Sequence, residues 1–181
     1  MLIRPTVKDD EGVLRKGTTC FFRNVELDYT VLSLIEDGAS VWIHGDSVGC
    51  QSWSFATLAG TMDLSLHIVA SDPRMECWYP HPMVRRLQDT LEDWQNDFHW
   101  DVVYATNCIG YAPQDRLNDI VEQLAWGCRG YLVVTHIDRK LLEPHFDPVT
   151  LNQAAIKRNW RHPDKAVQSE ECFLYRRRLE E

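Results

Sequence analysis

The chain has 181 residues, of which 44% are hydrophobic and 25% charged, with a net charge of −8, as in one soluble globular domain. No apolar run approaches the roughly 20 residues that span a bilayer, and the N-terminus lacks the apolar core of a secretory signal. We therefore expect a cytoplasmic protein with no membrane segment, and the acidic balance disfavours nucleic acid as a partner.

The first part of the chain predicts one helix. Residues 1–16 are polar and mixed, and we interpret them as a lead-in to a single domain over residues 17–181. The stretch GTTCFFRN (17–24) follows, with no alternation and no helical stripe. Its arginine either ends a piece of core or is held for a function. The segment 25–36 then predicts a helix, because its apolar residues lie near one face. These residues are Leu27, Val31, Leu34 and Ile35.

The next elements alternate between strand and helix. The apolar run SVWIH (40–44) predicts a buried strand, and helical spacing resumes over 52–60. LSLHIVASD (64–72) predicts a second strand that ends on an acid. The segment 80–95 predicts a helix, because four apolar residues share one stripe. They are Met83, Leu87, Leu91 and Trp94.

The second half repeats this alternation. WDVVYAT (100–106) predicts a strand, and 114–130 predicts an amphipathic helix with a glycine-rich stop. Strands follow over 131–137 and 171–178. Strands that alternate with helices, and that are continuously apolar, predict a mostly parallel sheet with helices on both faces.

Polar residues follow the predicted strands at the sheet edge where such folds bind ligands. The turn GDSVGC (45–50) has G-x-x-x-G spacing, which matches neither a dinucleotide nor a triphosphate loop, and a plain strand-to-helix turn is the alternative. Asp72 either accepts the hydroxyls of a ribose or is an ordinary turn acid. Asn107 either lines a pocket or bonds the turn backbone. His44 is interpreted as a hydrogen-bonded wall of that pocket.

Six cysteines and seven histidines are scattered along the chain, with no CxxC-type pair and no HExxH motif. We therefore expect no metal site. The cysteines are interpreted as reduced, buried side chains of an intracellular core.

Five short motifs stand in a characteristic order: T-x-F-F-R, a strand with G-x-S-x-G-x-x-x-x-S, a strand with A-S-D, W-D-x-x-x-x-x-N-x-x-x-Y, and a last strand ending in Y-R-R. Together they resemble the catalytic domain of the chemotaxis-receptor glutamate methyltransferases (CheR type), which are class I S-adenosylmethionine-dependent methyltransferases. The resemblance runs from Thr18 to Arg178. It implies an α/β fold: one Rossmann-like, seven-stranded methyltransferase domain, mostly parallel, with helices on both faces and an antiparallel last strand.

The resemblance also implies site residues and a cofactor, S-adenosylmethionine, with S-adenosylhomocysteine as product. The implied catalytic residues are Arg23, at the reactive end of the cofactor, and Tyr111, near the transferred methyl group. Asp72 corresponds to the ribose-binding acid. The other implied cofactor-binding residues are Thr19, Gly45, Asp46, Ser47, Gly49, Gln51, Asn107 and Cys108.

Methyl transfer from a sulfonium is an in-line displacement, so the protein mostly supplies alignment and a dry site. A carboxylate acceptor is already ionised at pH 7 and needs no general base. A guanidinium, for which Arg23 is the candidate, would hold that carboxylate in line. The acceptor expected from this chemistry is a protein carboxylate or a small molecule.

The chain departs from the family pattern at three positions: Gln51 replaces an acid, Trp53 replaces a tyrosine, and Thr106 replaces an arginine. The N-terminal helical domain and the receptor-contacting β subdomain are expected to be absent, since 34 residues separate Asp72 from Asn107. A protein partner would then supply the missing surface. The alternative is a catalytically inactive protein of the methyltransferase fold with a binding or structural role. Base methylation is disfavoured, because no NPPY-like motif follows the 100–106 strand.

Overall fold

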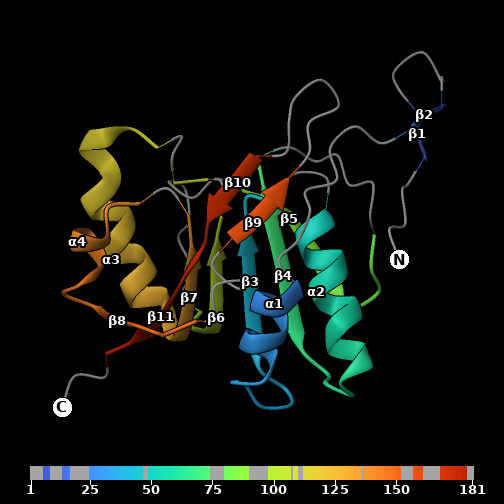
Figure 1. Ribbon diagram of the computed structural model, residues 1–181, viewed down its shortest axis with the longest axis horizontal. Helices are drawn as coiled ribbons and strands as arrows, with labels where there is room; N and C mark the ends of the chain where they lie inside the picture. Colours follow the sequence, from blue (N-terminus) through green and yellow to red (C-terminus); the bar gives the residue numbers. More distant parts are fainter. Residues whose placement is uncertain are drawn as a thin grey trace.

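The computed structural model describes residues 6–8, 14–16, 25–46, 49–73, 80–89, 98–106, 108–109, 112–135, 137–151, 157–160 and 168–178. Its central element is a seven-stranded sheet in the order β5-β4-β3-β6-β7-β11-β8 (Figure 1). The strands are β3 (Ser40–His44), β4 (His67–Asp72), β5 (Val84–Gln88), β6 (Trp100–Ala105), β7 (Cys128–Val134), β8 (Phe146–Pro148) and β11 (Phe173–Arg177).

Strand direction follows the predicted pattern. The five strands from β5 to β7 are parallel, and β11 runs antiparallel to both of its neighbours, β7 and β8. The predicted α/β architecture, a mostly parallel seven-stranded sheet with an antiparallel last strand, is confirmed.

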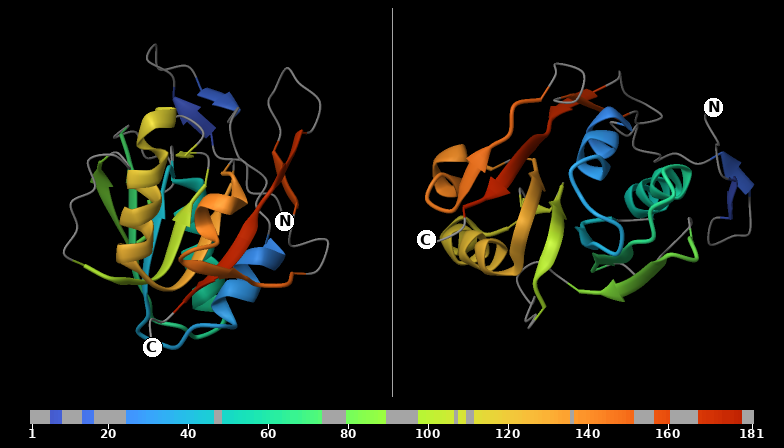
Figure 2. Two further views of the ribbon diagram at one scale, coloured as in Figure 1. Left: turned by 90° about the vertical axis from the view of Figure 1, so that its left-hand side faces the viewer. Right: turned by 90° about the horizontal axis from the view of Figure 1, so that it is seen from below.

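Helices cover both faces of the sheet, as Figure 2 shows from below. One face packs against α1 (Val25–Leu32) and α2 (Cys50–Thr61). The other packs against α3 (Leu117–Gly127), which continues a 3₁₀ turn η2 (Gln114–Arg116), and against α4 (Arg139–Leu142). Two antiparallel pairs lie outside the sheet: β1 (Thr6–Lys8) with β2 (Leu14–Lys16), and β9 (Lys157–Trp160) with β10 (Gln168–Glu171).

Alternate residues of β3 divide the core into two clusters. Val41 and Ile43 point towards α1 and α2 and join Phe55 in one cluster. Trp42 points to the opposite face and joins Leu124 of α3 in the other. A strand that is buried on both sides reads as a continuous apolar run, which explains why SVWIH carried a clear signal.

The helix predicted over 80–95 is wrong in its described part. Residues 84–88 form β5, which pairs in parallel with β4 from Ile68↔Val84 to Asp72↔Gln88. Leu87, placed on the expected apolar stripe, is 38% exposed. Pairing with β4 therefore outweighs a weak helical periodicity, and prolines at 80 and 82 disfavour helical backbone just before the strand.

Two element ends also differ from expectation. The helix α1 ends at Leu32, so Leu34 lies beyond it and is 41% exposed. No loop separates α3 from β7, and the predicted glycine stop is partly strand. Gly130 lies in β7 where the register with β6 shifts, and a Cβ there would collide with the carbonyl oxygen of Asp101. A glycine at this bulge lets the two strands approach closely.

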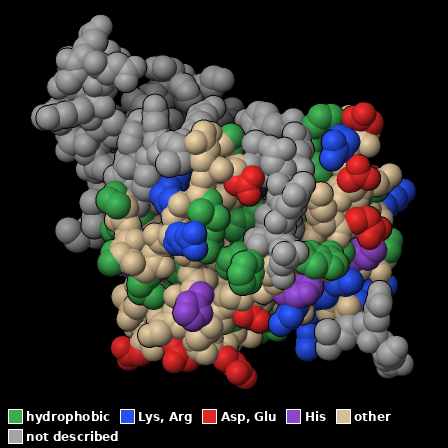
Figure 3. Space-filling view, turned by 180° about the vertical axis from the view of Figure 1, so that it is seen from behind, with side chains coloured by type: hydrophobic (Ala, Val, Ile, Leu, Met, Phe, Trp, Pro, Cys, Tyr) green, Lys and Arg blue, Asp and Glu red, His purple; other side chains and the backbone are tan. Residues whose placement is uncertain are grey.

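The described surface mixes charges with hydrophobic groups. Seen from behind, acidic side chains gather along the lower edge, and basic and histidine side chains lie among hydrophobic ones (Figure 3). This face is therefore not the uniformly basic surface that binds nucleic acid.

None of the described helices has the length and apolar character needed to cross a bilayer. The boundary between a lead-in and a domain at residue 17 stays a prediction.

Two glycines provide a matched test of packing. Gly130→Ala should lower the free energy of unfolding by about 1–3 kcal/mol, because the new methyl group forces β6 and β7 apart. Gly60→Ala in α2 has open space around its Cβ and should raise it by up to about 1 kcal/mol. Urea denaturation measures both free energies of unfolding. Equal effects of the two substitutions would contradict the close approach of β6 and β7 at Gly130.

Candidate functional site

The carboxyl ends of β3, β4 and β6 meet at one edge of the sheet. His44 pairs in register with Ser71 of β4 and with Ala105 of β6. Asp72, the last residue of β4, is 6% exposed. The strand ends therefore bring together the segments in which the sequence predicted a site.

Gly45 fixes the turn that leaves β3. Its φ is 75°, a left-handed conformation that favours glycine, and its N–H donates to the carbonyl of Ser71 over 2.9 Å. A Cβ at Gly45 would lie 2.7 Å from the carbonyl oxygen of Thr106 and 3.1 Å from the Cβ of Cys108. The turn is thus pressed against the segment that follows β6, which requires glycine for space as well as for conformation.

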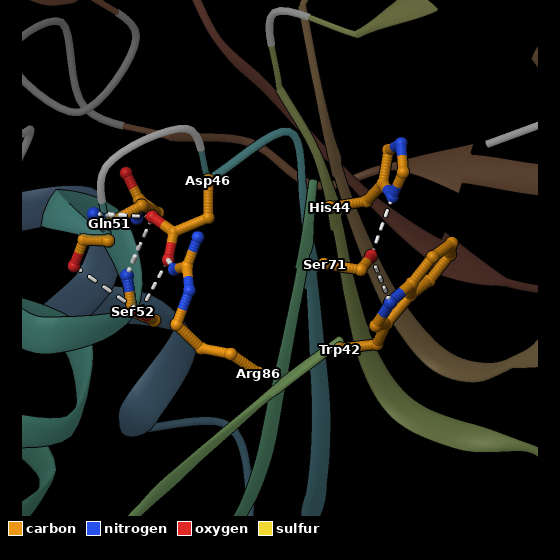
Figure 4. A network of polar contacts seen from close by, with 8 residues as sticks. Trp42, His44, Asp46, Gln51, Ser52, Ser71 and Arg86 are labelled. Carbon is orange, nitrogen blue, oxygen red and sulfur yellow. Dashed lines mark hydrogen bonds and ion pairs between the residues drawn. The ribbon is translucent and has the colours of Figure 1, made fainter. Parts of the chain in front are cut away.

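Asp46 caps the helix α2 (Figure 4). One oxygen of its carboxylate accepts the N–H groups of Gln51, at 2.8 Å, and Ser52, at 3.2 Å. The other accepts the hydroxyl of Ser52 and an N–H of Arg86, the latter at 2.9 Å. The N-cap residue itself is Gly49, with φ 93° and no side chain to cap the helix. Asp46 therefore takes over the capping role from outside the helix.

This capping contact decides which ligands the turn can hold. In dinucleotide-binding folds, free N–H groups at the start of the first helix bind the pyrophosphate. Here the N–H groups of Gln51 and Ser52 bind a carboxylate of the chain itself. A phosphate at this place would meet a negative charge, so the geometry favours a ligand without phosphate.

Arg86 reaches this cluster from the edge strand β5, where it pairs in register with Ala70. The side chain of Asp46 is fully buried in the ion pair, and that of Arg86 is 17% exposed. The sequence did not reveal this residue, because the segment around it was interpreted as a helix. A strand assignment would have placed Arg86 on the α2 face of the sheet.

Gln51 points towards α1. Its Nε2 donates to Oδ1 of Asp28 over 3.1 Å, and the same oxygen accepts the hydroxyl of Tyr104 over 2.9 Å. Asp28 is 2% exposed, although it lies on a helix between the buried residues Leu27 and Val31. An acid within a buried stripe was the available signal for this network. Gln51 thus ties α2 to α1 through its side-chain amide.

His44 belongs to a second network, on the opposite face of the sheet. Trp42 Nε1 donates to Oγ of Ser71 over 2.9 Å, and that oxygen lies 2.7 Å from Nδ1 of His44. Burial lowers the pKa of His44 to about 4, although the nearby carboxylate of Asp72 acts in the opposite direction. His44 is therefore a neutral imidazole at physiological pH, and its interpretation as a hydrogen-bonded residue is confirmed.

Two described thiols, Cys108 beside the turn at Gly45 and Cys128 at the amino end of β7, are kept protonated by burial. Burial raises the pKa of Cys108 to about 12, and the carboxylate of Asp72 adds a small effect in the same direction. Burial also raises the pKa of Cys128 to about 12. Cys108 and Cys128 are free thiols. Among the described residues, no group of acidic, histidine or cysteine side chains could hold a metal ion.

The structure places six of the predicted site residues at the carboxyl edge or at the start of α2. They are Gly45, Asp46, Gly49, Gln51, Asp72 and Cys108. The other five lie outside the described residues, so their roles stay predictions. They are Thr19, Arg23, Ser47, Asn107 and Tyr111.

Several solved structures share this architecture. The 1,6-didemethyltoxoflavin-N1-methyltransferase of Burkholderia thailandensis, solved with S-adenosylhomocysteine, is 12% identical and has a TM-score of 0.60 over 83% of this chain and 76% of its own. The chain has a methyltransferase fold. The N-methyltransferase NodS of Bradyrhizobium japonicum WM9, also solved with S-adenosylhomocysteine, is 8% identical, with a TM-score of 0.61 over 85% and 83% of the two chains.

A third similar structure is that of an enzyme named for magnesium protoporphyrin IX. The magnesium protoporphyrin IX methyltransferase of Synechocystis PCC 6803, solved with bound S-adenosylmethionine, is 14% identical, with a TM-score of 0.58 over 86% and 79% of the two chains. No family model and no curated protein matches the sequence. At sequence identities this low, structural similarity establishes the fold but not the activity. The activity has to be argued from the residues of the site.

The ion pair between Asp46 and Arg86 can be measured with a double-mutant cycle. Arg86→Met should lower the free energy of unfolding by about 2 kcal/mol, because it leaves a buried carboxylate without its cation. Asp46→Asn and the double variant complete the cycle, with an expected coupling of about 1–3 kcal/mol. Arg85→Met, at the exposed neighbouring position, should change stability by less than about 0.5 kcal/mol. A coupling near zero would contradict the pairing.

The burial of His44 predicts a specific acid sensitivity. Its pKa in the folded protein, about 4, lies below the ordinary 6.5, so the unfolded chain binds the extra proton as pH falls. The contribution of neutral His44 is fully present above pH 6.5 and should decline by about 3 kcal/mol down to pH 4. Urea denaturation at several pH values should therefore show a shallower acid loss for His44→Gln than for wild type. His67→Gln, at an exposed histidine of β4, is the control.

Proposed function

We propose that this protein is an S-adenosylmethionine-dependent methyltransferase that releases S-adenosylhomocysteine. The observation that carries the proposal is the capping of α2 by Asp46, within a sheet whose strand order is β5-β4-β3-β6-β7-β11-β8. The occupied helix start argues against a dinucleotide or a phosphorylated cofactor. A nucleoside cofactor without phosphate, of the kind present in the similar solved structures, suits this turn.

The charges of the site also suit such a cofactor. The sulfonium and ammonium groups of S-adenosylmethionine are cations, and Asp72 contributes a carboxylate at the same edge. Asp72 would accept the ribose hydroxyls, and the backbone at Gly45 would let the cofactor approach closely. Asp46 and Gln51, predicted to bind the cofactor, would instead support it indirectly, because their side chains hold α2, β5 and α1.

The remaining cofactor contacts come from the sequence. Thr19, Ser47, Gly49, Asn107 and Cys108 would line the site, as the CheR-type resemblance implies. When bound, the cofactor supplies an activated methyl group, and the protein aligns it with the acceptor.

We infer that the acceptor is a small molecule or a carboxylate. Two similar enzymes are named for small molecules, 1,6-didemethyltoxoflavin and magnesium protoporphyrin IX. The CheR-type motifs favour a carboxylate, with Arg23 holding it and Tyr111 beside the methyl group. A protein carboxylate would need a partner surface.

The second candidate is a catalytically inactive protein of the same fold with a binding or structural role. Gln51 is the observation in its favour, because this amide replaces the family's acid and is bound to Asp28. The two candidates differ in cofactor binding and in turnover.

Calorimetric titration with S-adenosylhomocysteine tests the proposal. Wild type should bind with a Kd in the micromolar range, and Asp72→Asn should weaken binding by about tenfold or more, because it removes a charged acceptor from the ribose. Asp119→Asn, at an exposed position of α3, is the matched control and should bind like wild type. NAD⁺ should not bind.

Lack of binding at millimolar S-adenosylhomocysteine, or binding that Asp72→Asn leaves unchanged, would contradict the cofactor assignment. Binding without methyl transfer to any member of a panel of small carboxylic acids, phenols and amines would favour the inactive candidate. If the protein is an active methyltransferase, Arg23→Ala should abolish turnover or weaken cofactor binding.

A further inference from the structure

His44 has one ring nitrogen that its network does not use. Nδ1 faces Ser71, and Nε2 lies at the far side of the ring, beyond the end of β3 (Figure 4). Nε2 has no hydrogen-bond partner among the described residues. The polar side-chain atoms that are both fully buried and unpaired there are Trp100 Nε1 and Gln123 Oε1. His44 is 2% exposed, so Nε2 is a nearly buried donor that points past the end of β3, where a ligand at the strand ends would meet it.

The network also fixes which ring nitrogen carries the hydrogen. The indole of Trp42 can only donate, so it occupies one lone pair of the Ser71 oxygen. Ser71 is fully buried, and within the described residues its hydroxyl hydrogen has one acceptor in reach, Nδ1 of His44. If Nδ1 carried the hydrogen instead, the hydroxyl hydrogen of Ser71 would be left without an acceptor in the core, which costs about 1–3 kcal/mol. Nδ1 is therefore the acceptor, and the hydrogen of the neutral ring is on Nε2.

The donor lies next to the residue that would hold the ribose. His44 pairs in register with Ser71, and Asp72 is the following residue of β4. The carboxylate of Asp72 opposes the effect of burial on the pKa of His44, as expected for neighbouring residues at the ends of β3 and β4. One ligand that crosses the strand ends of β3 and β4 can therefore contact both.

We propose that His44 is an adenosine-binding residue that donates its Nε2–H to a ring nitrogen of the adenine, beside the ribose held by Asp72. The inference rests on the proposed function. Adenine presents ring nitrogens as acceptors, and the fixed hydrogen on Nε2 is complementary to them.

A neutral donor also avoids a conflict with the rest of the cofactor. An imidazolium at this edge would repel the sulfonium, and burial keeps the imidazole uncharged at physiological pH. The same arrangement argues against a general-base role for His44, since the accessible nitrogen already carries a hydrogen.

The test compares two His44 variants by calorimetry, with S-adenosylhomocysteine and with 5′-methylthioadenosine, which lacks the amino-acid end. His44→Leu should weaken both ligands by about tenfold, whereas His44→Gln, which keeps an N–H donor, should weaken them by less than about threefold. Ser71→Ala keeps the imidazole but releases its hydrogen, and should weaken both by an intermediate factor. If His44→Leu does not fold, the affinity of Ser71→Ala for the two ligands tests the inference in its place.

Long-range ¹H–¹⁵N spectra of the imidazole provide an independent readout. Wild type at pH 7 should show the Nε2–H form, and its ¹⁵N resonance should shift when S-adenosylhomocysteine is added. An Nδ1–H form, or equal affinity of His44→Leu and wild type for S-adenosylhomocysteine, would overturn the inference and leave the proposed function intact. A loss confined to S-adenosylhomocysteine, with methylthioadenosine unaffected, would also overturn it. Absence of binding to wild type would overturn both.

Discussion

The arrangement of the site depends on the contacts made by one carboxylate, that of Asp46. It replaces the missing side-chain cap at Gly49, satisfies the first N–H groups of α2 and binds the guanidinium of Arg86. Through these bonds, one side chain joins the end of β3, the start of α2 and the edge strand β5. Because these N–H groups already bind a carboxylate, this helix start is unfavourable for a phosphate.

Two buried networks lie on opposite faces of the same sheet edge. On the α2 face, Asp28 connects Gln51 with Tyr104. On the α3 face, Ser71 connects Trp42 with His44. Both satisfy polar groups that would be costly to bury alone. The strand ends are therefore held in place by buried hydrogen bonds on both faces of the sheet.

The sequence predicted the sheet well because its central strands are buried on both sides. SVWIH matches β3 residue for residue, and the positive φ of Gly45 and Gly49 agrees with the expected turn. The sequence failed at β5, whose Arg85 and Leu87 face outward and leave no apolar run to recognise. It could not show that Asp46 binds Arg86 or that Gln51 binds Asp28, since those pairs are 40 and 23 positions apart and only the fold brings them together.

The position of β11 constrains the order in which the sheet can be completed. The strands β3, β4, β5, β6 and β7 pair with one another, so this part can assemble as the chain leaves the ribosome. In contrast, β8 is made before β11, its one neighbour among the described strands, so this pairing waits until residues 173–177 have been synthesised. During that interval the outer edge of β7 is also open to pairing with other chains, which makes the late arrival of β11 the step most exposed to aggregation.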